Sequence, residues 1–502
     1  MTAFRQFPLG SRYPDSPHAV ASSLPTLADV RGYEEKDPEV LAAMTSGYPR
    51  FLRHAYVREL TGIFLEEAGL SGSEGVLVPD RGAAEDLVRY TGERCRLLEV
   101  ADGLWLARHD AEDAETAEAV RRYTQHTGCA IGSREAEDHL VKRGRLEAAF
   151  PEAAFAGDAG GEARKRLAEL CGCREADVYL CASGMNAFHA TFRAARDLQR
   201  ERGRRHWLQL GWLYLDSGCV LREFLDEADT LECRYDVTDT EALCRRIAEA
   251  GDALAGVVVE CPTNPLLRVG DLPRIAEAVA EAGGILMADP TIGSVYNMDV
   301  FRHCDVLVSS LTKYASHEGD VMLGMFALNS GSRFAAGLRE RVEALRVAPY
   351  PRDLARMAEE MRGAPEVVRG MNANAAKLAE YLRRHRLVRR VFHAADSPLL
   401  GSVARHPEAA GCVVSVELRE GVMERFYDAA RVLKGPSFGA RFTLMCPFMY
   451  LAHYDLVSTA SGRRFLGEVG IDPELVRLSV GTEPYAEIEA VFAEALDAAD
   501  VR

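Results

Sequence analysis

The chain has little that points to a membrane protein, an exported protein or a nucleic-acid binder. No apolar stretch approaches the roughly 20 residues needed to cross a bilayer, and the opening MTAFRQFPLGSRYPDSP contains no hydrophobic signal region. No basic cluster stands out, and the formal net charge is -16, which argues against binding to the phosphate backbone of nucleic acid. We therefore expect a cytoplasmic protein with no membrane or nucleic-acid partner.

A disulfide framework and a metal site are not expected either. The 12 cysteines are scattered along a large chain, a pattern that favours reduced and mostly buried thiols. Cys171 and Cys173 are separated by one residue and have no second pair nearby, which is poor spacing for zinc. A structural role for this pair is the simpler interpretation.

The composition is that of a folded protein. Hydrophobic residues make up 48% of the chain and charged residues 27%, a balance typical of globular proteins. A chain of 502 residues is too long for one ordinary core, so we expect two or more cooperating domains.

Three regions differ in their hydrophobic pattern. In residues 1–130, segments such as DPEVLAAM and YVRELTGIFLEEAGL have apolar positions at helical spacing, which predicts a helical N-terminal extension. In residues 131–365, helical segments alternate with short β-branched runs, which predicts an α/β domain with a mainly parallel sheet. In residues 366–502, a long helical pattern precedes alternating segments such as CVVSVELRE, which predicts a smaller α+β domain.

Four predicted strands of the α/β region end in small or polar residues. They lie in the segments ADVYLCASG, ALAGVVVECPTNP, GGILMADPTIG and CDVLVSSLTK. Open α/β sheets place their ligands beyond the carboxyl ends of the strands. We therefore expect these four ends to meet at one binding site.

A lysine, Lys313, directly follows the last of these apolar runs. Burial lowers the pKa of an amine because it disfavours the charged form, so a buried lysine here could attack an aldehyde near neutral pH. Taken alone, a surface lysine at the start of a loop is the more common explanation. The assignment therefore depends on its neighbours.

Phosphate ligands are available on both sides of this lysine. Ser310 and Thr312 flank it with hydroxyl groups, and the run of Ser183, Gly184 and Met185 comes just before a predicted helix. Backbone amides at a helix N-terminus bind anions well. An SGM turn by itself is weak support, because small residues are common between a strand and a helix.

Two further residues fit the ring of an aromatic cofactor. Asp289 ends the run GGILMAD, followed by Thr291, and a carboxylate facing a pyridine nitrogen would keep that nitrogen protonated. A helix or turn cap is the alternative role for Asp289. Asn264 is either a turn residue between prolines or a hydrogen-bond partner for the ring oxygen. Together, the amine, phosphate site and carboxylate fit pyridoxal 5'-phosphate (PLP), held as an imine on Lys313.

At this point the chain resembles the cysteine and methionine metabolism family of PLP enzymes, which includes cystathionine γ-synthase, cystathionine lyases and methionine γ-lyase. The order SGM, E-x-PTNP, D-x-T and S-x-TK is that of the family. Within it, the chain is most similar to the fungal-type cystathionine γ-synthase branch, and the likeness covers nearly the whole chain. The segments that carry this likeness are LPTLADVRGYEE, GYPRF, HTGCAIGSREAE, LYLDS, DPTIGSVYNMDV, SSLTK, KGPSFGARFTLMCPF and VRLSVGTE.

The resemblance implies fold type I of the PLP-dependent transferases, the aspartate aminotransferase type, and it implies specific roles. Lys313 matches the lysine that binds PLP and shuttles protons, and Asp289 matches the partner of the ring nitrogen. Tyr214 lies where the family has an aromatic residue stacked on the cofactor that assists proton transfer. Arg477 matches the arginine that binds the substrate carboxylate, and Ser437 belongs to a loop lining the same pocket. The implied phosphate ligands are Gly184, Met185, Ser310 and Thr312.

One implied phosphate ligand comes from a second subunit. Arg134 resembles the arginine of a Tyr-Ser-Arg motif that reaches the phosphate of the neighbouring subunit, so a homodimer or homotetramer with shared active sites is expected. The tyrosine position of this motif is Gly132 here, which removes one ligand, and Tyr123 and His126 are candidates to compensate. The family's usual Asn after the strand aspartate is Pro290.

The expected reaction is γ-substitution or γ-elimination on an L-amino acid that carries a γ-leaving group, as in the conversion of O-acyl-homoserine and cysteine to cystathionine. A first alternative is a γ-lyase of specialised metabolism that acts on an unusual amino acid, such as a γ-halogenated unsaturated one, and leaves an alkyne. A second is a non-catalytic scaffold or ligand-binding protein with the same fold. A third, an aminotransferase or aldolase, would share the lysine and aspartate but not the γ-synthase-like segments.

Overall fold

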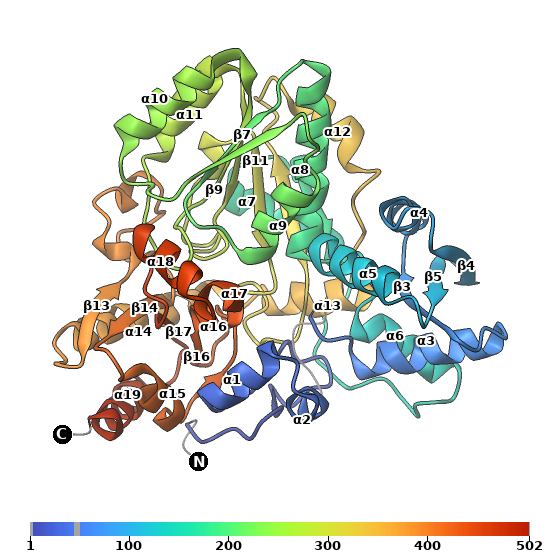
Figure 1. Cartoon of the computed structure of the whole chain (residues 1–502), viewed down its shortest axis with the longest axis horizontal. Coiled ribbons are helices and arrows are strands. Elements are labelled where there is room, and N and C mark those ends of the chain that lie inside the picture. The colour runs from blue at the N-terminus through green and yellow to red at the C-terminus, as the bar shows by residue number, and fades with distance from the viewer. Residues whose placement is uncertain (1–3, 45–50, 501–502) are drawn as a thin grey trace.

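The computed structural model describes residues 4–44 and 51–500, coloured from blue to red in Figure 1. The first four residues of the GYPRF segment lie outside these ranges. None of the described helices is long and apolar enough to cross a membrane.

The largest sheet in the described residues has seven strands, in the order β6-β12-β11-β10-β9-β7-β8. Neighbouring strands from β11 through β10, β9 and β7 to β8 are parallel, whereas β12 is antiparallel to both of its neighbours. This confirms the prediction of a mainly parallel sheet. The strands are β6 (Val178–Cys181), β7 (His206–Leu210), β8 (Thr230–Arg234), β9 (Leu254–Glu260), β10 (Ile285–Asp289), β11 (Val306–Ser310) and β12 (Gly324–Leu328).

Helices cover both faces of this sheet (Figure 1). The central strands are apolar on both sides, because each face packs against a separate layer of helices. One layer contains α7 (Ala159–Cys171), α10 (Thr240–Ala250), α11 (Leu272–Ala282) and α13 (Pro351–Glu360). The other contains α8 (Gly184–Glu201), α9 (Leu215–Glu223), α12 (Ala335–Val342) and α5 (Ala114–Thr127).

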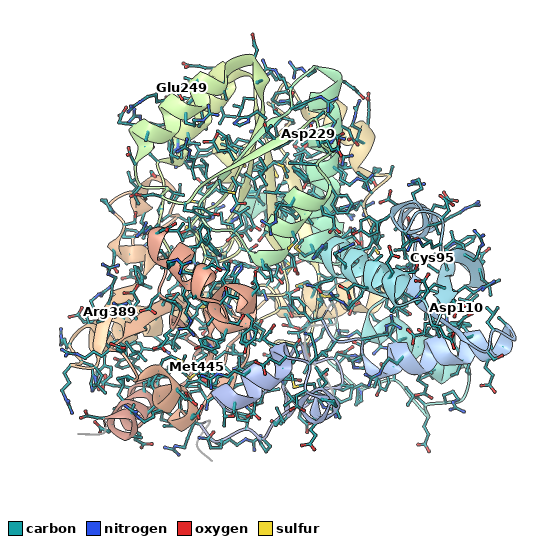
Figure 2. The ribbon with its side chains drawn as sticks, viewed as in Figure 1. Cys95, Asp110, Asp229, Glu249, Arg389 and Met445 are labelled. Atoms are coloured by element: carbon teal, nitrogen blue, oxygen red, sulfur yellow. The ribbon has the colours of Figure 1, made fainter. Side chains whose placement is uncertain are left out.

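The C-terminal part of the chain forms a second sheet of five strands among the described residues, in the order β13-β14-β17-β16-β15. Its side chains fill a separate core in which Met445 lies (Figure 2). The strands are β13 (Val388–Phe392), β14 (Val413–Leu418), β15 (Leu433–Lys434), β16 (Leu444–Pro447) and β17 (Val476–Ser479). The helices are α14 (Ala364–Arg383), α15 (Met423–Ala429), α16 (Phe448–Ala452), α17 (Tyr454–Val457), α18 (Ala460–Glu468) and α19 (Tyr485–Ala499).

The N-terminal part divides between two locations (Figure 1). Its first segment packs on the C-terminal core through buried residues such as Leu24, Leu27 and Val30. This segment contains β1 (Arg12–Tyr13), β2 (Ala21–Ser22), α1 (Leu27–Glu34) and α2 (Pro38–Ala43). The next elements lie beside the large sheet and are α3 (Ala55–Glu67), β3 (Ser73–Val78), α4 (Arg81–Tyr90), β4 (Arg96–Ala101), β5 (Leu104–Asp110) and α6 (Ser133–Lys142).

The N-terminal region, expected to be a helical extension, contains strands as well as helices. Strands β3, β5 and β4 form a small antiparallel sheet there. Strand β4 is an edge strand whose residues are exposed or half-buried, so it lacks the continuous apolar run that marks a buried strand. The helices expected around DPEVLAAM and YVRELTGIFLEEAGL are present as α2 and α3.

Candidate active site

A cavity of about 300 Å³ lies at the carboxyl ends of β6, β9, β10 and β11. All four predicted strand ends reach it, through Ser183, Glu260, Asp289 and Ser310. Of the predicted site residues, the cavity is lined by Ser183, Gly184, Met185, Tyr214, Asn264, Asp289, Thr291, Ser310, Thr312, Lys313 and Arg477. The tertiary fold therefore gathers residues that are spread over about 300 positions of the sequence.

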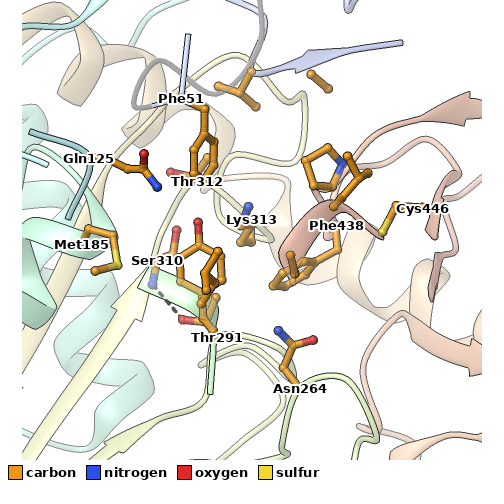
Figure 3. Close-up of a pocket in the computed structure, with 18 of the residues that line it drawn as sticks. Phe51, Gln125, Met185, Asn264, Thr291, Ser310, Thr312, Lys313, Phe438 and Cys446 are labelled. Carbon is orange, nitrogen blue, oxygen red and sulfur yellow. Dashed lines mark hydrogen bonds between the residues drawn. The ribbon is translucent and has the colours of Figure 1, made fainter. Parts of the chain in front are cut away.

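Lys313 projects into the middle of this cavity (Figure 3). Its side chain is buried, with 8% of the residue exposed. The Nζ atom donates a hydrogen bond to the Oγ atom of Ser437 at 3.2 Å and lies 4.9 Å from the centre of the Phe438 ring. Ser437 thus contacts the predicted cofactor lysine directly from the C-terminal region.

The N-terminus of helix α8 forms one wall of the cavity. Ser183 caps the helix, since its Oγ atom accepts a hydrogen bond from the backbone N–H of Asn186 at 3.0 Å. A Cβ atom on Gly184 would lie 2.8 Å from the Cβ atom of Ser310, closer than side chains pack. Only glycine lets the helix end approach β11 this closely, which leaves its first amides facing the cavity.

The hydroxyl groups near this wall already have partners within the chain. Thr291 Oγ1 accepts a hydrogen bond from the backbone N–H of Ser310 at 2.9 Å, drawn as a dashed line in Figure 3. Thr312 Oγ1 donates to the carbonyl of Leu323 at 3.2 Å and accepts from its N–H at 3.1 Å. Thr291 and Thr312 therefore hold the loop that carries Lys313 against its neighbours.

Two carboxylates lie side by side at the floor of the site. Asp289 and Glu260 are paired residues at the ends of the adjacent parallel strands β10 and β9. Burial raises the pKa of both groups, and the proximity of Asp289 raises that of Glu260 further. Asp289 Oδ1 accepts a hydrogen bond from the N–H of Thr291 at 2.8 Å, and Glu260 Oε1 accepts one from the N–H of Tyr214 at 2.6 Å.

Glu260 was missed by the sequence reasoning. Its signal was its position at the end of an apolar run in the segment ECPTNP, the same pattern that pointed to Asp289. Glu260 connects two parts of the site. It accepts a hydrogen bond from the backbone N–H of Tyr214, just before α9, and it lies next to Asp289 on the adjacent strand.

Arg477 lies on the opposite side of the cavity, on β17. It is 4% exposed, and its Nη1 atom donates a hydrogen bond to Asn264 Oδ1 at 3.0 Å. The guanidinium carbon lies 5.0 Å and 4.8 Å from the ring centres of Phe438 and Phe448. The aromatic rings and Asn264 hold a planar cation at the cavity wall, an arrangement suited to binding a carboxylate.

Arg134 is not brought to this cavity. It is 1% exposed and forms ion pairs with Glu152 at 2.6 Å and Asp353 at 2.9 Å, and its Nη1 atom also donates to the carbonyl of Asp320. A role at the phosphate of a neighbouring subunit stays a prediction.

The two residues considered as replacements for the missing tyrosine do not line the cavity either. Tyr123 is buried and donates a hydrogen bond to Asp86 at 2.7 Å. His126 is paired with Glu223, outside the cavity lining.

The outer wall of the cavity comes from residues that were not among the predicted site residues. Met44, Phe51 and Leu52 contribute apolar groups, and Arg121 and Gln125 reach it from α5. Charged residues from the end of α1 also line it. Burial raises the pKa of the Glu34 carboxyl, and the positive charge of Lys36 lowers it by a smaller amount, so the pKa is about 7.

Comparison with known proteins decides the family. The profile of the family described as "Cys/Met metabolism PLP-dependent enzyme" matches residues 162–497. The chain belongs to this family. It is therefore a PLP-dependent enzyme, which confirms the resemblance and the cofactor and argues against a non-catalytic scaffold.

The whole chain also has full-length relatives. It is 39% identical over 490 residues to the L-2-amino-4-chloropent-4-enoate dechlorinase/desaturase of Streptantibioticus cattleyicolor, covering 97% of each chain. It is 26% identical to the cystathionine γ-synthase of Neurospora crassa, covering 98% of this chain and 99% of that one. The relation to a fungal enzyme agrees with the predicted branch.

Solved structures confirm the fold class. The crystal structure of cystathionine γ-synthase from Xanthomonas oryzae pv. oryzae matches with a TM-score of 0.58 and 23% identity, over 70% of this chain and 92% of that chain. A methionine γ-lyase from Micromonospora echinospora matches with a TM-score of 0.56, also at 23% identity, over 70% and 90% of the two chains.

The residues of the cavity fit PLP. A buried lysine amine lies at its centre, a carboxylate at its floor, and a helix N-terminus at a wall that a single Cβ on Gly184 would disturb. Lys313 would hold the aldehyde carbon, Asp289 the ring nitrogen and the start of α8 the phosphate.

Proposed function

We propose that this enzyme acts on an L-amino acid with a leaving group on its γ-carbon, and that its substrate is a γ-chlorinated unsaturated amino acid of the L-2-amino-4-chloropent-4-enoate type. The observation that carries this proposal is the 39% identity, over 97% of both chains, to a dechlorinase/desaturase named for that substrate. The cystathionine γ-synthase of Neurospora crassa is only 26% identical over a similar share.

The cavity wall supports a substrate with an apolar side chain. Met44, Phe51, Leu52 and Phe448 line the cavity that holds Lys313. A chloroalkenyl group can pack against these side chains and displace water from them. Its burial is favourable because the group has no hydrogen-bond donor or strong acceptor that would be left without a partner.

Each cavity residue has a defined task in this proposal. Arg477 binds the substrate α-carboxylate and so fixes the orientation of the α-carbon. The Nζ atom of Lys313 removes the α-proton, and the carboxylate of Asp289 keeps the ring nitrogen of the cofactor protonated. When bound, PLP supplies the electron sink that stabilises negative charge on the substrate.

The net reaction is the loss of hydrogen chloride. The α-carbon and then the β-carbon each give a proton to Lys313, and the bond from the γ-carbon to chlorine breaks with its electron pair leaving as chloride. One proton is returned to carbon, so the net loss is one proton and one chloride. Departure of chloride from a vinylic γ-carbon leaves a carbon–carbon triple bond, so the product is an alkyne-bearing amino acid.

A second candidate is γ-substitution with a second amino acid. The outer cavity wall contains Glu34, Lys36 and Arg121, charges of both signs that suit the ammonium and carboxylate groups of a zwitterion such as cysteine. With O-acyl-homoserine as the first substrate, this reaction would give cystathionine.

We further propose that the enzyme works in the cytoplasm as a homodimer or homotetramer in which Arg134 approaches the site of a neighbouring subunit. We also propose that the chain divides into three domains, with boundaries near residues 130 and 365. The second boundary is supported by the separation of the strands into a seven-stranded sheet before it and a five-stranded sheet after it.

The test is direct assay of the purified holoenzyme. It would be given L-2-amino-4-chloropent-4-enoate, and separately O-acetyl-homoserine with and without cysteine, while chloride is measured and products are identified by mass spectrometry. Chloride release with an alkyne product supports the main proposal. Cystathionine formation without chloride release supports the second candidate and contradicts the first.

Lys313→Ala should lose both turnover and the visible absorption band of the lysine-bound cofactor, because the substitution removes the amine proposed to form the imine. The control is Lys377→Ala, on the exposed face of α14, which should retain both. Full activity in Lys313→Ala would contradict the assignment.

A further inference from the structure

The hydroxyl of Tyr214 is the first member of a hydrogen-bond chain that runs from the cavity into helix α5. It donates to Asp216 Oδ2 at 3.1 Å. The other oxygen, Oδ1, accepts from Gln125 Nε2 at 3.0 Å, and Gln125 Oε1 accepts from Arg121 Nη1 at 2.9 Å. Three of these four residues line the cavity, and Asp216 lies behind them.

Asp216 is completely buried, with 0% exposure. A buried carboxylate is costly unless hydrogen bonds and nearby positive charge compensate for lost water. Here it accepts from Tyr214 and Gln125, and it lies in the first turn of α9, where the helix dipole favours negative charge. An apolar residue at this position would avoid the free-energy cost of burying a carboxylate. The presence of Asp216 therefore suggests a functional role.

Two positively charged groups on α5 interact with Asp216. These groups are Arg121 and His126, and His453 before α17 also interacts with Asp216, but burial lowers the pKa of His453 to about 4 and so disfavours its charged form. Helix α8, which also packs against α9, contributes the sulfur of Met185, 4.0 Å from Ser217 Oγ. The positive charge near Asp216 therefore comes from α5.

We propose that Asp216, held in place by Gln125, is a positioning residue that fixes the phenol of Tyr214 in the active site. With its hydrogen directed to Asp216, the phenolic oxygen presents its lone pairs to the cavity, where they can accept a hydrogen bond from the substrate ammonium group. Asp216 acts through Tyr214 and does not touch the substrate. This inference rests on the proposed function, because it assigns Tyr214 a part in it.

A double-mutant cycle tests whether Asp216 acts through this hydroxyl. Asp216→Asn keeps the size of the side chain and removes its charge. It should lower kcat/KM about 10- to 100-fold, the loss expected for one hydrogen bond to a charged group. In the Tyr214→Phe background the same substitution should cost less than about 2-fold, since the interaction is already absent. Equal losses in both backgrounds would overturn the proposal.

A readout without substrate separates positioning from general damage. The visible circular dichroism of the bound cofactor depends on the groups packed against it, so it should change in Asp216→Asn. It should not change in the control Asp226→Asn, an Asp to Asn change at an exposed residue beyond the end of α9 that pairs with Arg200. An unchanged spectrum in Asp216→Asn together with wild-type kcat/KM would also overturn the proposal.

Two further experiments cover the cases in which Asp216→Asn does not fold or the chlorinated substrate is not turned over. If Asp216→Asn does not fold, Gln125→Met removes the second support of the carboxylate and should lower kcat/KM about 3- to 10-fold, with the same dependence on Tyr214. If the chlorinated substrate is not turned over, the cycle is measured on exchange of the α-proton of L-norvaline with deuterium oxide. That exchange requires Lys313 and the cofactor but no leaving group, so failure of the proposed substrate and failure of this inference are distinguishable.

Discussion

The close contact between helix α8 and the large sheet gives a sharp prediction for Gly184→Ala. The new Cβ atom would lie 2.8 Å, 3.0 Å and 3.1 Å from the Cβ, Cα and Oγ atoms of Ser310. Ser310 cannot easily move away, because it is paired with Gly324 in the neighbouring strand β12. Gly324 is itself packed tightly against the helix start, since a Cβ atom added to Gly324 would lie 2.5 Å from Gly184 Cα. The helix start must therefore move away from β11, at a cost of about 1–3 kcal/mol.

This movement displaces the backbone amides proposed to bind the cofactor phosphate. If the whole cost appears in cofactor binding, the Kd for PLP should rise about 5- to 150-fold. The assay is equilibrium binding of PLP to the apoprotein, with thermal unfolding of the apoprotein measured in parallel to detect any cost that falls on folding instead.

A matched glycine provides the control. Gly62 lies in the exposed middle of α3, and a Cβ atom there would meet nothing within 4 Å. Gly62→Ala should leave PLP binding unchanged and stabilise the protein by up to about 1 kcal/mol, because alanine favours helix. The reasoning is refuted if Gly184→Ala matches Gly62→Ala in both PLP affinity and thermal stability.

Two other predictions concern ionisable groups. Asp289→Asn should lower kcat at least about 100-fold, because a neutral amide cannot hold a proton on the cofactor ring nitrogen. It should not destabilise the apoprotein, since burial already disfavours the ionised carboxylate, and a fall in apoprotein melting temperature would contradict this. For His126, burial lowers the pKa, but hydrogen bonds with Cys219 and Glu223 outweigh it and raise the pKa to about 9. Because this folded-state pKa lies above the unfolded value of 6.5, the His126 contribution, about 3 kcal/mol, is fully present below pH 6.5 and lost as pH rises through 9. Urea unfolding of wild type and His126→Gln between pH 6 and 9.5 checks this, and parallel profiles for the two proteins would show it to be wrong.

Much of the site could be predicted because its signals are local. Lys313, Asp289 and Ser183 each stand at the end of an apolar strand, and strand ends in an α/β sheet converge on one edge. The motif order then identified the family, and the matched profile confirmed it. These inferences needed only the residue types and their sequence neighbours.

Other parts required the tertiary structure because they depend on which distant elements meet. The pairing of Glu260 with Asp289 follows from the register of β9 against β10, and the approach of Gln125 to Asp216 follows from the packing of α5 on α9. The ion pairs of Arg134 within its own chain depend on residues up to 219 positions away. Neither periodicity nor spacing encodes such distances, since each is set by the packing of whole elements.

The sequence by itself determined the fold class, the cofactor and the residues at the strand ends, because hydrophobic pattern and motif order are properties of short segments. Only the tertiary structure decided the walls of the cavity, the partners of Tyr214 and Arg477, and the small sheet beside the main one. The physical reason is that burial and hydrogen bonding between distant segments arise only when the chain has folded, and these contacts select the geometry in which local signals become an active site.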